Sequence, residues 1–135
     1  MAWYLLDSNA FLWFKVKPQI LRPQARQEIE NGRNELFVSL ASLWELWIKA
    51  SAGRLGEYEE LFRGDAASML RSLQESGFAL LPIELHYAIA AARLPRHHAD
   101  PFDRMLIAQA MSEGLTIISS DNAFRRYSSV KVLRA

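Results

Sequence analysis

The sequence predicts an α/β fold: a three-layer sandwich with a mainly parallel central sheet of about five short strands, flanked by helices. Short apolar runs, which are typical of buried strands, alternate along the chain with segments whose apolar residues have helical spacing. Strands separated by helices need crossover connections, and these give a parallel sheet covered on both faces. No linker or repeat interrupts the pattern, so residues 1–135 are expected to form one domain.

The expected strands are short and almost wholly apolar. They cover residues 3–6, 36–38, 78–81, 115–118 and 130–133. The first run ends at Asp7, and the third lies between Gly77 and Pro82. Runs of this length and composition favour strands that are buried on both faces.

Helices are expected in the intervals between the strands. They cover a segment up to Pro18 and residues 23–31, 39–51, 58–62, 66–75, 85–93 and 102–112. Ser8 or Asn9 can cap the first helix, and Pro23 suits the first turn of the second. Leu43 and Leu46 belong to an apolar set that recurs at helical spacing in the third.

Composition excludes several classes of protein. Half of the 135 residues are hydrophobic and 23% are charged, which is ordinary for a globular domain and excludes intrinsic disorder. The chain has no cysteine, which excludes a disulfide framework, a cysteine nucleophile and the usual structural zinc sites. Its 16 basic and 15 acidic residues nearly balance, so attraction to nucleic acid would have to come from local clusters of charge.

The sequence gives no sign of membrane association. The first residues lack a positively charged region and reach Asp7 too early for a signal peptide. No apolar run approaches the roughly 18 residues that are needed to span a bilayer. We therefore expect a cytoplasmic protein.

Four acidic residues are candidates for a common site. Asp7 and Asp121 follow the first and fourth expected strands, and ligands of parallel sheets bind beyond the carboxyl ends of strands. Glu45 and Asp103 lie near the starts of helices that could bring them to the same edge. Carboxylates that converge repel one another unless a cation compensates, and oxygen-only ligands suit Mg²⁺ or Mn²⁺.

Each acid also has a purely structural interpretation. Asp100, followed by Pro101 and Asp103, is a good N-cap, and Asp103 can complement the helix dipole. Asp121 can cap a following turn, and Glu45 can be a solvated helix residue. No single acid decides between the two interpretations.

Four segments together resemble the PIN domain, and more closely the VapC-like toxic ribonucleases of bacterial type II toxin–antitoxin pairs. The segments are YLLDSNAFLW, ASLWELWIK, HHADPFDRMLIAQA and GLTIISSDNAF. The resemblance runs over essentially the whole chain, and the acids occur in the order typical of the family. It implies a PIN-like fold and cleavage of RNA phosphodiester bonds.

The resemblance also implies a set of site residues. Asp7, Glu45, Asp103 and Asp121 would bind one or two Mg²⁺ ions, with Mn²⁺ as a substitute, and would support attack by a metal-activated water. Asp7 and Asp103 are expected as direct ligands, with the other two acting through waters. Asp100 belongs to the Asp-Pro-Phe-Asp variant of one branch, and whether it joins the metal site or only caps the helix stays open.

Substrate contacts are expected from groups around the acids. The candidates are Ser8, Arg96, His97, Arg104 and Arg125. The alternative for each basic residue is a solvated surface. The adjacent His97 and His98 could indicate a metal site, but no further nitrogen or sulfur ligand accompanies them.

Aromatic residues suggest a protein partner. They include Phe11, Trp13, Phe14, Trp44, Trp47 and Tyr58. Some could line an exposed groove for an amphipathic helix of a cognate antitoxin, although packing into the core is the alternative for each. The family implies a homodimer or a toxin–antitoxin hetero-oligomer.

Two other functions deserve comparison with the nuclease. A phosphoaspartyl enzyme of the haloacid-dehalogenase type would need an acid two positions after Asp7, where this chain has Asn9. A receiver domain would need an acidic pair before its phosphorylated residue, and Asp7 comes too early. A non-catalytic PIN-like module that binds RNA or protein is the remaining alternative, and the presence of all four acids favours the enzyme.

Overall fold

The computed structural model describes residues 1–135 and contains a five-stranded sheet in which every neighbouring pair is parallel. The strands are β1 Trp3–Leu6, β2 Glu35–Ser39, β3 Phe78–Leu81, β4 Thr116–Ser119 and β5 Val132–Arg134. Their order across the sheet is β3-β2-β1-β4-β5. The predicted fold class is confirmed, and the sheet is wholly rather than mainly parallel.

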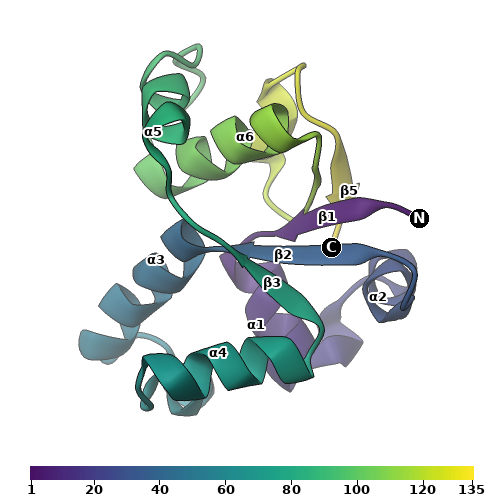
Figure 1. The fold of residues 1–135 in the computed structure, drawn as a ribbon, viewed down its shortest axis with the longest axis vertical. Coiled ribbons are helices and arrows are strands. Elements are labelled where there is room, and N and C mark those ends of the chain that lie inside the picture. The colour runs from purple at the N-terminus through teal and green to yellow at the C-terminus, as the bar shows by residue number, and fades with distance from the viewer.

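Helices connect and cover the strands. The α-helices are α1 Ser8–Val16, α2 Pro23–Glu30, α3 Leu40–Ser51, α4 Ala66–Glu75, α5 Leu85–Ala92 and α6 Pro101–Glu113. Three 3-10 helices are η1 Pro18–Ile20, η2 Gly56–Phe62 and η3 Asn122–Arg126. In Figure 1, α5 and α6 lie above the sheet and α1 and α4 below it, which gives the three layers. No helix is both long and apolar enough to cross a membrane.

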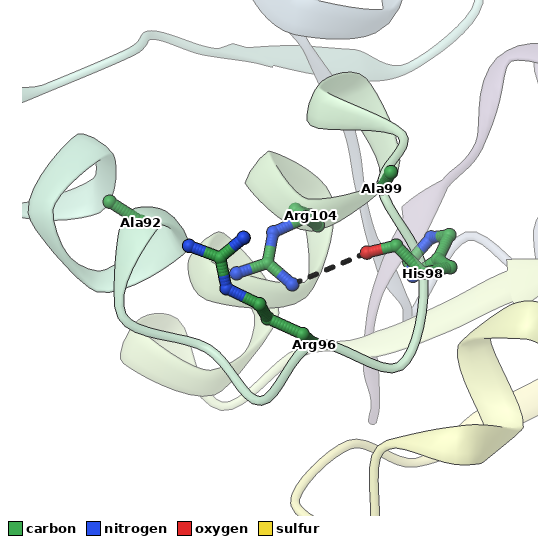
Figure 2. Close-up of a pocket in the computed structure, with 5 residues that line it drawn as sticks. All are labelled: Ala92, Arg96, His98, Ala99 and Arg104. Carbon is green, nitrogen blue, oxygen red and sulfur yellow. Dashed lines mark hydrogen bonds between the residues drawn. The ribbon is translucent and has the colours of Figure 1, made fainter.

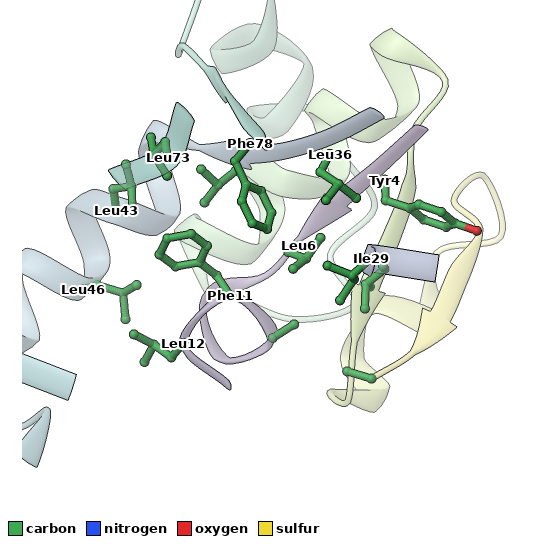
Figure 3. Close-up of a cluster of buried hydrophobic side chains, with 14 of the residues drawn as sticks. Tyr4, Leu6, Phe11, Leu12, Ile29, Leu36, Leu43, Leu46, Leu73 and Phe78 are labelled. Carbon is green, nitrogen blue, oxygen red and sulfur yellow. The ribbon is translucent and has the colours of Figure 1, made fainter. Parts of the chain in front are cut away.

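Each face of the sheet has its own apolar core. Successive strand residues point to opposite faces, and Leu6 and Leu5 illustrate this, because both are fully buried but in different clusters. Leu6 joins the larger cluster, where Phe11 of α1 packs edge-on against Phe78 of β3 with ring centroids 5.5 Å apart (Figure 3). Leu5 joins the smaller cluster, together with Ile107 of α6. Helices therefore hold both sides of the strands that carry the candidate site.

Three predicted elements differ from the structure. Asp7, not Ser8 or Asn9, caps α1, because Asp7 Oδ1 accepts a hydrogen bond from the Ala10 backbone N–H at 2.9 Å. The predicted helix over 58–62 is the 3-10 helix η2, whose N–H groups bond three residues back. The last strand begins at Val132, because the Val130 N–H is used in a turn to Tyr127.

The strand order reverses at β1, which places a crevice beyond its carboxyl end. From β1 the chain builds β2 and β3 on one side, and β4 and β5 lie on the other. Such a switch point is where open parallel sheets bind ligands. Asp7 follows β1 there and donates its backbone N–H to Ile118 of β4 at 3.1 Å, and Asp121 lies just past β4.

Candidate functional site

The predicted acids come together in one polar pocket at this switch point. Its volume is about 150 Å³, and none of its lining residues is hydrophobic. The lining residues are Asp7, Ser8, Asn9, Glu45, Lys49, Asp100, Asp103 and Asp121. They come from the ends of two strands and from three helices, so only the folded chain assembles this concentration of negative charge.

Asp7 is the most deeply buried acid of the pocket, with 7% of its surface exposed. Burial raises the pKa of its carboxyl to about 6, and the negative charges of Asp121 and Glu45 act in the same direction. Hydrogen bonds from the Ser119 hydroxyl and the Ala10 N–H oppose that rise. Both carboxyl oxygens of Asp7 therefore have fixed donors, which hold the group in one orientation.

Glu45 faces Asp7 from the second turn of α3. The Ser8 hydroxyl donates to Glu45 Oε1 at 2.5 Å, and Lys49 Nζ, one turn later on α3, lies 3.9 Å from Oε2. Lys49 is the only cationic side chain that lines the pocket. The predicted small hydroxyl at Ser8 thus orients an acid of the pocket.

The start of α6 contributes two acids. Asp100 Oδ1 caps the helix by accepting from the backbone N–H groups of Phe102 at 2.9 Å and Asp103 at 3.1 Å. Asp103 points into the acidic pocket, where burial and the charges of Asp100 and Glu45 raise the pKa of its carboxyl to about 7. The capping interpretation of Asp100 is confirmed, and Asp100 lines the pocket as well.

Asp121 is the most open of the four principal acids. Its Oδ1 accepts from the Ala123 N–H at 2.9 Å and so caps η3, as the structural interpretation predicts. Its own backbone N–H donates to the Ser119 hydroxyl at 2.9 Å. Ser119 therefore connects Asp121 to Asp7 at the junction of β4 and β1.

The acids are close but do not form a finished metal site. No group of three or more His, Asp or Glu side chains has the spacing of a set of metal ligands. The reason is visible in their partners: Asp7 faces Ser119, Glu45 faces Ser8, and Asp100 caps α6. The pocket offers carboxylate and hydroxyl oxygens with little positive charge, which is the donor set of a hard divalent cation.

The Arg104 guanidinium hydrogen-bonds to backbone carbonyls, a structural role that the sequence did not indicate. Its Nη2 donates to the carbonyls of Ala91 and Leu94 at 2.9 Å each, at the end of α5, and its Nη1 donates to Pro95 at 2.9 Å. Figure 2 shows Arg104 beside Arg96 in a hollow of about 400 Å³. The Arg104 guanidinium therefore already has hydrogen-bond partners within the chain, whereas the Arg96 side chain makes no hydrogen bond or ion pair.

Of the two adjacent histidines, His98 rather than His97 reaches an acid. His98 Nε2 lies 3.5 Å from Asp103 Oδ2. His97 is exposed, packs edge-on against Tyr127 and accepts from Arg126 Nη1 through its carbonyl at 3.1 Å. Arg125 is exposed on η3, just after Asp121. Neither His97 nor Arg125 lines the acidic pocket.

Most of the predicted aromatic residues pack inward. Phe11 is buried in the larger core, and Trp13, Phe14, Trp47 and Tyr58 pack against it. Trp44 is the exception, since 55% of its surface is exposed and it meets Phe102 edge-on with centroids 5.5 Å apart. A groove of about 490 Å³ lies between α3 and η2, where Trp47 and Phe62 are its aromatic lining.

Sequence reasoning missed the hydrogen bond from Ser119 to Asp7 and the approach of His98 to Asp103. Ser119 could have been found from register, because β1 and β4 pair Leu6 with Ile118, which puts the next residues, Asp7 and Ser119, side by side. His98 was noted only as one of a pair. No sequence signal distinguishes it from His97, because the course of the loop decides which ring turns inward.

Known proteins resemble this chain over nearly its full length. A family model for the PIN domain matches residues 4–130. The chain is 32% identical over 130 residues to Ribonuclease VapC22 of Mycobacterium tuberculosis, covering 94% of this chain and 93% of the relative.

Solved structures agree on the fold. VapBC2 from Rickettsia felis, bound to a DNA fragment from its promoter, matches with a TM-score of 0.69 at 15% identity, covering 98% of each chain. VapBC-5 from Mycobacterium tuberculosis, a member of a family of toxin–antitoxin systems, matches with a TM-score of 0.62 at 21% identity, covering 100% of each chain. With the family match over residues 4–130, these likenesses establish that the chain belongs to the PIN-domain family.

Proposed function

We propose that this protein is a metal-dependent endoribonuclease that cleaves RNA phosphodiester bonds, and that it is the toxin of a type II toxin–antitoxin pair. The observation that carries the proposal is the convergence of Asp7, Glu45, Asp103 and Asp121 in one wholly polar pocket. Membership of the PIN-domain family and the similarity to a VapC ribonuclease support it.

The chemistry of the pocket supports Mg²⁺ as the cofactor, with Mn²⁺ as a possible substitute. All of the acidic donors are oxygens, which both ions prefer. Burial raises the pKa of Asp7 to about 6 and that of Asp103 to about 7, and the negative charges of the neighbouring acids add to both increases. A divalent cation would relieve this repulsion and favour the ionised carboxylates.

Each acid has a distinct role in this proposal. Asp7 and Asp103 would bind the ion directly, because burial and neighbouring negative charge disfavour the ionised form of both carboxyls and a cation would offset this effect. Glu45, held by Ser8, and Asp121 bind through waters or orient the attacking water. Asp100 caps α6 and faces the pocket, so it can contribute charge without leaving its cap. When bound, such an ion would lower the pKa of a coordinated water toward about 7.

Substrate binding is proposed for exposed basic residues near the pocket. Arg96 lies in the hollow beside α6, and Arg125 follows Asp121 on η3. Either would meet RNA phosphates as they approach the acids, and His97 lies between Arg96 and His98 in the same loop. Arg104 is left out of this set, because its donors serve the end of α5.

The test is cleavage of a pool of structured RNAs by the purified protein, with Mg²⁺, with Mn²⁺ and with EDTA. We expect cleavage with either ion, none with EDTA, and none in Asp7→Asn. Glu30→Gln is the matched control, because Glu30 is exposed on α2 and pairs only with Arg26. RNA binding without cleavage in the wild-type protein would contradict the proposal and support the non-catalytic module.

A protein partner is part of the same proposal. The groove between α3 and η2 combines the aromatic Trp47 and Phe62 with the charged Glu59 and Arg63, and it therefore offers apolar and polar contacts to an amphipathic antitoxin helix. Expression with the product of a neighbouring small gene should give a stable hetero-oligomer by size-exclusion chromatography, and Trp47→Ala should weaken it. The protein alone is expected as a homodimer.

A further inference from the structure

His98 connects the pocket to a buried tyrosine. Its Nδ1 lies 2.8 Å from the hydroxyl of Tyr127, and its Nε2 lies 3.5 Å from Asp103 Oδ2. The His98 and Asp103 side chains are 13% and 19% exposed, and Tyr127 is 2% exposed. His98 Nε2 is fully buried and makes no hydrogen bond, and the Asp103 carboxyl is the acidic group that it approaches. The imidazole therefore fills the space between Tyr127 and Asp103.

The donors and acceptors around His98 indicate which nitrogen of its ring carries the proton. Arg104 Nη1 can only donate, and it lies 3.4 Å from the Tyr127 hydroxyl oxygen. The Tyr127 hydroxyl can accept from Arg104 and still donate its proton to His98 Nδ1, and this is the direction that we assign to the 2.8 Å contact. A neutral ring that accepts at Nδ1 carries its proton on Nε2. In that tautomer the Nε2–H would be on the nitrogen that lies 3.5 Å from Asp103 Oδ2, a separation slightly longer than a formed hydrogen bond.

We propose that His98 is a positioning residue that holds the Asp103 carboxylate through its Nε2–H, while Tyr127 fixes the tautomer of His98. The proposal rests on the proposed function in one respect, namely that Asp103 is a metal ligand. Metal-binding side chains are generally oriented by neighbouring residues that hydrogen-bond to them without touching the metal. Loss of such a neighbour weakens metal binding by about 10–100-fold. His98 does this for a carboxylate that the structure gives no other side-chain donor.

The arrangement also explains why a histidine suits this position. Burial of Asp103 disfavours its ionised form, and the charges of Asp100, Glu45 and Asp121 act in the same direction. An imidazole N–H stabilises a carboxylate without adding a full positive charge that would compete with a metal cation. The Arg104 guanidinium also supports the loop, because it donates to the His98 carbonyl at 3.4 Å (Figure 2).

The tautomer can be measured without metal or RNA. Long-range ¹H–¹⁵N correlation spectra of the chelated wild-type protein should show a neutral His98 with its proton on Nε2, at about pH 8. In Tyr127→Phe this preference should be lost, because Nδ1 no longer has a donor. A wild-type ring that is protonated on Nδ1 would overturn the assignment.

Metal affinity tests the positioning role. Calorimetric titration with Mn²⁺ should show His98→Ala binding about 10–100-fold more weakly than wild type. His98→Gln should recover most of the loss, because its amide can also donate toward Asp103. Tyr127→Phe should weaken binding by a smaller factor. His86→Ala is the matched control, because this ring is exposed on α5 and does not line the pocket, and it should bind as wild type does.

The outcomes separate this inference from the proposed function. Wild-type protein that binds no Mn²⁺ would overturn both. Binding that Asp103→Asn abolishes but His98→Ala leaves unchanged would overturn the positioning role alone. A loss in His98→Ala that glutamine does not recover would show that the ring only fills space, which also overturns it.

Discussion

The hydroxyl of Ser119, the last residue of β4, donates a hydrogen bond to Oδ2 of Asp7, the residue that follows β1. The same hydroxyl oxygen accepts from the Asp121 backbone N–H at 2.9 Å. The Ser119 side chain therefore holds the buried Asp7 carboxyl in one orientation and also positions the backbone of Asp121. It does so at the point where the strand order reverses, so the geometry of the site depends directly on the pairing of β1 with β4.

Loss of this hydroxyl should destabilise the protein. We expect Ser119→Ala to lower the free energy of unfolding of the chelated protein by about 1–3 kcal/mol at about pH 8, because Asp7 is left buried without this donor. The control is Ser42→Ala, since the Ser42 hydroxyl is also buried but has no hydrogen-bond partner. Urea denaturation measures both variants, and equal effects would contradict the importance of the Ser119–Asp7 bond.

Stability should fall as the pH rises. In the folded protein the carboxyls of Asp7 and Asp103 have pKa values of about 6 and about 7, compared with a reference value of 3.8. At pH values between the reference and these raised values, the folded state therefore binds more protons than the unfolded state does. Unfolding free energy therefore decreases from about pH 4 to about pH 7 in the absence of divalent ions. Urea denaturation in EDTA across this range measures the slope.

Asp103→Asn isolates the contribution of the Asp103 carboxyl to the change of unfolding free energy with pH. The variant should be more stable than wild type in EDTA at about pH 8, by about 1–3 kcal/mol, and should lose this advantage at about pH 4, where the wild-type carboxyl is protonated. An identical slope in both proteins would show that the burial of Asp103 does not control the pH dependence.

Mg²⁺ should stabilise the protein more strongly at high pH than at low pH. Ligands must be ionised to bind a cation, and Asp7 and Asp103 are protonated in the fold below about pH 6. The increase in melting temperature on adding Mg²⁺ should therefore be large at about pH 8 and small at about pH 5. An increase of the same size at both values would place the ion elsewhere.

Arg104→Lys should lose stability even though the charge is kept. A lysine cannot reproduce the fork that serves the carbonyls of Ala91, Leu94 and Pro95, so we expect a loss of about 2–4 kcal/mol in unfolding free energy. Arg96→Lys, which changes an exposed guanidinium in the same hollow, should have little effect. Wild-type stability with a raised KM for RNA would return Arg104 to substrate binding.

The layout of the fold follows from local patterns. The first and third strands were predicted with their exact bounds, Trp3–Leu6 and Phe78–Leu81, because Asp7 and Pro82 end them sharply. The last strand was predicted to begin at Val130, but it begins at Val132. The backbone N–H of Val130 is hydrogen-bonded in a turn to Tyr127 and so does not join the sheet. Apolar periodicity indicates which segments are buried, but hydrogen bonds of turns set where they begin.

The acids of the site were predictable, whereas the contacts that depend on how helices and loops pack were not. Asp7 and Asp121 are at strand ends, and a parallel sheet brings such ends to one edge. The commitment of Arg104 to the end of α5 depends on how two helices pack, and sequence proximity to Asp103 suggested a substrate contact instead. Capping and lining a pocket are also compatible roles, as Asp100 shows, so sequence alone could not separate them.

The most direct test of the central claim is single-turnover cleavage of a labelled RNA while Mg²⁺ is titrated, for wild type and for Asp103→Asn. We predict a rate that saturates with Mg²⁺ in the wild-type protein. In Asp103→Asn the half-saturating concentration should rise by about tenfold or more, or cleavage should be lost. Cleavage that persists in EDTA, or the same Mg²⁺ dependence in both proteins, would contradict a metal-dependent nuclease built on these acids.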